Sequence, residues 1–252
     1  MNRRIGALTP VWNQELFIKP HYDMLTEAGL DRYVVLMQKG PLPNYQKEHG
    51  YGIYPDLSRQ IIEEYFPQVE IYEGNYPTTI EFSGGLYNEG LEMMEDCDIV
   101  LRLDPDMFWT KKDFTAFIDY IRKTDFDCYR MDFRKNSINY YMTGDFNHGL
   151  KDAQEVDPLG VNPHFKFTGV LDYKVPIPKQ KVIDIPDWMC HHFRGWQKPK
   201  STPSGWDKMV SKEYIMEFGN RDKWFSCPDE IKAPIQEWLD ELEILKDNQY
   251  IM

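Results

Sequence analysis

The first half of the chain alternates between short apolar runs and longer amphipathic stretches. Short runs rich in Val, Ile and Leu predict buried strands, whereas apolar residues spaced three and four apart predict helices. The clearest helix covers residues 110–123, where one stripe holds Phe114, Phe117, Ile118 and Ile121. Strands are expected at 5–11, 32–37, 69–72, 98–103 and 127–133, and helices at 15–28 (with Gly29 as the stop), from 56 or 58 to 66, at 79–94 and at 110–123.

Strands that alternate with helices predict an α/β fold, in which helices flank a mostly parallel sheet on both faces. After residue 133 the pattern changes. We expect antiparallel strands at 136–142 and 163–175 with a loop between them, an extended segment at 182–194, and helices from residue 207 onward. Because no linker interrupts the chain, we predict one domain over residues 1–252, with a parallel half (1–135) and a mixed, partly antiparallel half (136–252) that ends in helices.

Composition narrows the function classes. The chain has 42% hydrophobic and 28% charged residues, which is a globular balance, and a net charge of −12. That charge argues against a broad, non-specific grip on nucleic acid or anionic membrane. We find no membrane span and no signal peptide. The chain has four cysteines, and they form no CxxC pair: Cys97, Cys128, Cys190 and Cys227. We therefore expect neither a zinc knuckle nor a disulfide framework, and we predict a reducing, cytoplasmic location.

Two acids follow the apolar run 98–103. Asp104 and Asp106, separated by Pro105, leave the expected strand one residue apart. Carboxylates at this spacing can reach one ion, and oxygen ligands suit Mg²⁺ or Mn²⁺. In parallel sheets, ligands bind beyond the carboxyl ends of the strands, where Asn13 also lies. The alternative is an ordinary Asp-Pro turn.

Three runs together, Ile5–Asn13, Ser83–Leu91 and Asp96–Asp106, resemble glycosyltransferases of the GT-A fold, especially those of family 2. The resemblance covers the predicted parallel half. It implies a Rossmann-like GT-A fold whose first half, residues 1–135, binds a nucleotide sugar. It also implies an enzyme that moves a sugar from a nucleoside-diphosphate sugar, with a UDP-sugar favoured, to an acceptor hydroxyl.

The same resemblance implies roles for individual residues. Asp106 would bind the Mn²⁺ or Mg²⁺ that neutralises the departing diphosphate, and Asp104 would contact the sugar or ribose directly or through the metal. Asn88 matches an asparagine of the family's helix, and Tyr87 stands where an arginine often precedes it. The end of the first strand would hold the nucleotide base through Thr9, Pro10 and Asn13.

The run Asp187–Trp196 resembles an element in which a histidine supplies a further metal ligand close to basic residues. Neutral imidazole suits Mn²⁺. In an extended segment His192 and Arg194 share one face, so we predict His192 as the ligand, His191 as the other candidate, and Arg194 as the phosphate partner. The basic loop that follows, which begins with Lys198, is expected to close over the diphosphate. The alternative is that the two histidines only pack.

An inverting transferase needs a base for the acceptor hydroxyl. Asp145, in a Gly-flanked loop, is our first candidate and joins Asp104 as a predicted catalytic residue. Glu155, Asp157 and Asp172 are the other candidates. A retaining enzyme would not need this base, and the sequence leaves the stereochemistry open.

The acceptor is left open between a saccharide and a hydroxymethylated DNA base. Basic segments could line a DNA groove on an otherwise acidic protein. Two other function classes remain. A sugar nucleotidyltransferase is disfavoured because no Gly-rich phosphate loop follows the first strand. A non-catalytic GT-A-like binding protein would keep the fold without turnover. The basic segments are 111–112, 122–123, 130, 134–135 and 198–212.

Overall fold

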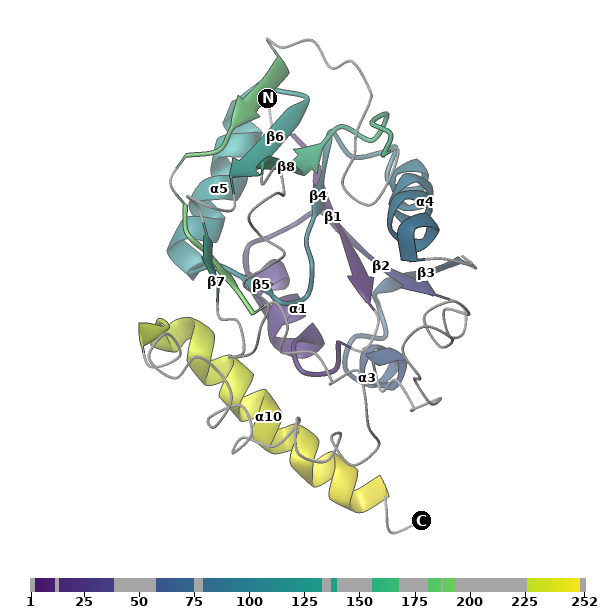
Figure 1. Cartoon of the computed structure of the whole chain (residues 1–252), viewed down its shortest axis with the longest axis vertical. Helices are drawn as coiled ribbons and strands as arrows, with labels where there is room; N and C mark the ends of the chain where they lie inside the picture. Colours follow the sequence, from purple (N-terminus) through teal and green to yellow (C-terminus); the bar gives the residue numbers. More distant parts are fainter. Residues whose placement is uncertain are drawn as a thin grey trace.

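A computed structural model of the chain describes most of the parallel half and parts of the mixed half (Figure 1). The described residues are 3–11, 14–38, 58–74, 79–132, 137–139, 156–167, 181–186, 188–193 and 226–249.

The main sheet has seven strands in the order β3-β2-β1-β4-β8-β6-β9. Its first four strands run parallel, β8 is antiparallel to both β4 and β6, and β9 is parallel to β6. This confirms the predicted α/β class with a mostly parallel sheet and a mixed part. The strands are β1 (Ile5–Val11), β2 (Arg32–Gln38), β3 (Glu70–Gly74), β4 (Ile99–Arg102), β6 (Cys128–Asp132), β8 (Val156–Val161) and β9 (Val182–Asp184).

Helices cover both faces of this sheet (Figure 1). α4 (Thr79–Met93) packs on one face through Leu8, Leu36 and Val100, which point to its side. The other face carries α1 (Ile18–Glu27), α5 (Lys111–Lys123) and α10 (Asp229–Gln249), with α3 (Ser58–Tyr65) beside α1. The alternation of side chains along each strand therefore divides the core into two layers. No helix among the described residues has the length and apolar character to cross a membrane.

Local sequence sets the helix ends. The Thr110 side chain accepts a hydrogen bond from the Asp113 backbone N–H at 3.1 Å and so caps α5, whose last turn holds Arg122 and Lys123. Gly29, with φ of 71°, follows the last turn of α1 in the left-handed conformation that favours glycine. Both ends agree with the sequence prediction.

A second, three-stranded sheet stands beside the first. β10 (Cys190–His192) pairs antiparallel with β5 (Met107–Phe108) and parallel with β7 (Ser137–Asn139). No pattern in the sequence predicts β5, because two residues are too short to show a period. The antiparallel pairing expected for 136–142 is wrong for β7, which is parallel to its partner.

The mixed half differs from prediction at β8. We expected a loop there, because Asp157, Pro158 and Gly160 resemble turn residues. Pro158 is tolerated because it borders a register shift in the pairing with β6, where a ladder hydrogen bond is already interrupted. The strand expected to begin at residue 163 is also wrong as far as residue 166, and residues 168–175 lie outside the described part of the chain.

Candidate active site

A tight turn places the two predicted acids at the carboxyl end of β4. The Met107 backbone N–H donates to the Asp104 carbonyl at 3.0 Å, which closes a four-residue turn. Asp is favoured at the first position of such a turn and Pro at the second, so the local sequence accounts for this geometry. The next residues enter β5, and the turn is thereby anchored between the main sheet and the small sheet.

Asp106 lies beside His192. β10 pairs with β5 so that His192 is opposite Met107, and the Phe193 backbone N–H donates to the Asp106 carbonyl at 2.8 Å. The His192 Nε2 atom is 3.6 Å from Asp106 Oδ1. Asp106 and His192 are only 4% and 8% exposed. A nearly dehydrated carboxylate beside an imidazole is an arrangement that favours a shared cation.

An aromatic base supports this pair. Phe108 and Phe193 pack edge to face with ring centroids 5.6 Å apart, and Phe17 of the segment before α1 contacts both. His21 of α1 stands perpendicular to Phe108 at 5.9 Å and is fully buried. Burial lowers the His21 pKa to about 3, and the Asp106 charge opposes this shift. The sequence alone does not distinguish His21, because a lone histidine inside a helix resembles an ordinary core residue.

His191 faces away from Asp106. Its side chain is buried, and burial lowers its pKa to about 4 while Asp113 of α5 raises it. Successive residues of a strand point to opposite sides. The structure thus brings His192, and not His191, next to Asp106.

Asp104 has different surroundings. It is partly exposed, and the Tyr87 hydroxyl donates to its Oδ1 atom at 3.1 Å. Burial raises the pKa of that hydroxyl well above its ordinary value, and the charge of Asp104 adds to the effect. The next residue of α4, Asn88, uses both ends of its amide on the backbone of Phe167, at 2.8 and 2.7 Å. The Asn88 side chain therefore fixes the segment that carries Phe167.

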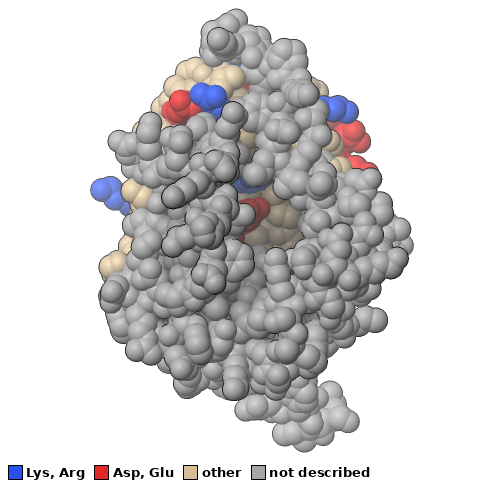
Figure 2. Space-filling view, viewed as in Figure 1, with Lys and Arg blue, Asp and Glu red and all other residues tan. Residues whose placement is uncertain are grey.

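The molecular surface is hollowed over this part of the sheet. In the space-filling view, Lys or Arg atoms and Asp or Glu atoms lie side by side inside the hollow, over the region of β1 and β4 (Figure 2). A hollow at the carboxyl ends of parallel strands is the expected place for a ligand in this type of sheet.

The donor set can hold part of a metal site. No group of three His, Cys, Asp or Glu side chains within the described ranges is close enough to hold an ion. The pair Asp106 and His192 supplies one oxygen and one nitrogen, separated by more than a hydrogen-bond distance. Mg²⁺ and Mn²⁺ commonly take one or two protein ligands and complete their shell with water and substrate phosphate. The residues fit such an ion, with Asp104 two positions away.

The remaining predicted site residues divide into two groups. Thr9 and Pro10 lie near the end of β1, where Thr9 is fully buried and Pro10 is partly exposed. Their contacts with a nucleotide base stay predictions. Outside the described residues lie Asn13, Asp145, Glu155, Asp172, Arg194 and Lys198, together with the side chain of Asp157.

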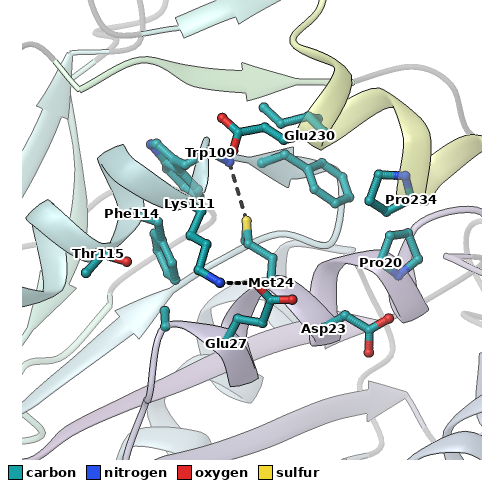
Figure 3. Close-up of a pocket in the computed structure, with 13 residues that line it drawn as sticks. Pro20, Asp23, Met24, Glu27, Trp109, Lys111, Phe114, Thr115, Glu230 and Pro234 are labelled. Atoms are coloured by element: carbon teal, nitrogen blue, oxygen red, sulfur yellow. Dashed lines mark hydrogen bonds and ion pairs between the residues drawn. The ribbon is translucent and has the colours of Figure 1, made fainter.

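A separate pocket of about 160 Å³ lies between α1, α5 and α10 (Figure 3). Its lining includes Met24, Phe114 and Pro234, with a Lys111–Glu27 ion pair of 3.1 Å at its edge. Among the described residues, its lining includes neither of the paired acids and no histidine, and it lies on the face of the sheet opposite α4. We therefore place the candidate active site at the carboxyl end of β4, where Asp104 and Asp106 lie.

Most of the described residues in the basic segments proposed for a DNA groove are paired with acids. Four of these cations have a carboxylate within 3.5 Å: Lys111 with Glu27, Arg122 with Asp31, Lys123 with Asp119 and Arg130 with Asp184. These pairs reduce the positive charge available to phosphates.

Comparison with known proteins gives a single kind of similarity. No family model and no curated protein matches the chain. Among solved structures, the crystal structure of S. aureus TarS 1-349 is similar, over 93% of this chain and 71% of that chain, with 12% sequence identity and a TM-score of 0.47. This is a likeness of fold, and the function proposed below rests on the side chains of the site.

Proposed function

We propose that this protein is a metal-dependent glycosyltransferase that uses a nucleoside-diphosphate sugar, with a UDP-sugar favoured. The observation that supports it is the Asp106–His192 pair, joined at the carboxyl end of β4 from segments far apart in the chain. Asp106 and His192 would hold Mn²⁺ or Mg²⁺, and Asp104 would contact the donor sugar or ribose. When bound, the ion would neutralise the negative charge that builds on the departing diphosphate.

The reaction breaks the bond between the sugar's anomeric carbon and the diphosphate and forms one to an acceptor oxygen. The acceptor hydroxyl loses its proton, for which Asp145 is the proposed base in an inverting reaction. The acceptor is a hydroxyl group of a saccharide or of a hydroxymethylated DNA base.

A thermal-shift screen tests the proposal. The chain is incubated with nucleoside diphosphates, each with and without Mn²⁺, and stabilisation is expected only when one diphosphate and the metal are both present. A long incubation of the matching nucleotide sugar should then release the nucleoside diphosphate slowly into water.

Other outcomes identify the competing classes. Release of pyrophosphate from a nucleoside triphosphate and a sugar phosphate would establish a nucleotidyltransferase. Metal-dependent binding without any hydrolysis or transfer would favour a non-catalytic protein. If no nucleotide stabilises the chain, the proposal is wrong.

A further inference from the structure

A charged residue ends the otherwise apolar strand β4. Ile99, Val100 and Leu101 are buried, whereas Arg102 is partly exposed, like Asp104 two residues later. Alternation along the strand puts Arg102 on the side of Val100, which packs in the layer beneath α4. Arg102 and Asp104, two residues apart and both partly exposed, therefore lie at the same carboxyl end of β4.

Two aromatic rings hold the guanidinium in place. Arg102 Cζ lies 5.5 Å from the centroid of the Tyr87 ring and 6.0 Å from that of Phe167. The two rings also pack on each other at 5.5 Å, and Asn88 fixes the Phe167 backbone with two hydrogen bonds. Cation–π contact with two buried rings orients the charge before any ligand arrives.

The same tyrosine connects this cation to the acid. The Tyr87 ring lies under Arg102, and the Tyr87 hydroxyl donates to Asp104. A positive and a negative group are thus held next to one another by one buried residue. Such a site suits a ligand that carries both phosphates and hydroxyls.

We infer that Arg102 binds the diphosphate of the nucleotide donor. This inference rests on the proposed function and adds a binding residue to it. The guanidinium offers planar N–H donors that match two phosphate oxygens at once. The negative charges of Asp104 and Asp106 repel a diphosphate. The positive charge of Arg102, at the same edge of the sheet, offsets part of that repulsion.

The test measures affinity by isothermal titration in the presence of Mn²⁺. The ligands are the nucleoside diphosphate that stabilises the parent best and its unphosphorylated nucleoside. Arg102→Met and Arg102→Gln should bind the diphosphate about ten- to a hundredfold more weakly, with nucleoside affinity unchanged. Arg102→Lys, which keeps the charge and loses the fork, should fall between them and the parent. Arg130→Met, on another strand of the sheet and paired with Asp184, is the matched control and should bind like the parent.

The outcomes separate this inference from the proposed function. Diphosphate affinity equal to the parent's in a folded Arg102 variant overturns the inference and leaves the proposed function standing. Equal weakening of nucleoside and diphosphate also overturns it, because that pattern indicates a packing role. If neither neutral variant folds, Arg102→Lys decides, since parent-like diphosphate affinity would exclude the bidentate contact. If the parent binds no nucleoside diphosphate with Mn²⁺, both proposals fail.

Discussion

Asp104 and Asp106 are two residues apart, yet their surroundings differ in kind. Asp106 is nearly buried beside His192, on an aromatic base formed by Phe17, Phe108 and Phe193. Asp104 is partly exposed and accepts a hydrogen bond from Tyr87. One acid belongs to the small sheet and its support, and the other to the layer under α4.

This difference assigns different tasks to two chemically identical side chains. A dehydrated carboxylate strongly favours a cation, because little water competes for its charge. A partly exposed carboxylate that already accepts a hydrogen bond is better suited to accept further bonds from hydroxyls. We therefore expect Asp106 to dominate metal binding and Asp104 to contribute to donor contacts.

The strongest test of this contrast exchanges each acid for its amide. Asp106→Asn should weaken metal-dependent binding of the nucleoside diphosphate by more than about a hundredfold, because it removes a charged ligand from a dehydrated site. Asp104→Asn should lose only about tenfold under the same conditions. Isothermal titration measures both, with Asp119→Asn, at an exposed position of α5, as the control. Equal losses at the two positions would contradict the contrast.

The adjacent histidines provide the next test. His192→Gln should weaken Mn²⁺-dependent binding about tenfold to a hundredfold, because loss of a ligand or its support has effects of this size. His191→Gln should leave that affinity nearly unchanged and lower the melting temperature, because it buries an amide where a neutral imidazole packs. Titration and thermal melts distinguish these effects. A larger loss of affinity for His191→Gln would place the metal on the other side of β10.

The third test concerns the aromatic base on the side of Asp106, where the buried His21 packs against Phe108. Because its pKa in the folded chain is lowered from 6.5 to about 3, the unfolded chain takes up the proton first. Stability from this group is complete above pH 6.5 and decreases as the pH falls toward 3. The loss between pH 7 and pH 5 should be about 2 kcal/mol. His21→Phe should remove that part of the acid sensitivity in urea unfolding at the two pH values.

His164 is the matched control for this measurement. It is an exposed histidine, and His164→Phe should leave the difference between pH 7 and pH 5 as it is in the parent. If His21→Phe keeps the full acid sensitivity, the lowered pKa of the buried His21 is not the source of that sensitivity.

The smallest expected effect concerns the hydroxyl on the side of Asp104. Tyr87→Phe removes one hydrogen bond and keeps the ring under Arg102, so affinity for the diphosphate donor should fall only about threefold to tenfold. Titration measures it, and Tyr120→Phe, whose ring packs on Trp188, is the control. A loss as large as that expected for Asp106→Asn would mean that Tyr87, and not the buried pair, organises the site.

Elements with strong periodicity were predicted well. The stripe of Phe114, Phe117, Ile118 and Ile121 is buried in α5, and the acids do leave β4 in a turn. The prediction was wrong where pairing overrides local preference, as in β8 with Pro158 and Gly160. It had no basis for β5, because two residues form a strand only when β10 lies alongside.

The sequence by itself determined the helix ends at Thr110 and Gly29 and the order of strands and helices in the first half. It also determined which side chains, those of the Asp-Pro-Asp turn, stand at the carboxyl end of β4. Those features depend on backbone preferences and on residues close together in the chain. Only the tertiary structure decided that His192 lies beside Asp106 and Arg102 beside Tyr87 and Phe167. These neighbours are far apart in sequence, and their positions follow from strand pairing and packing, which no local pattern encodes.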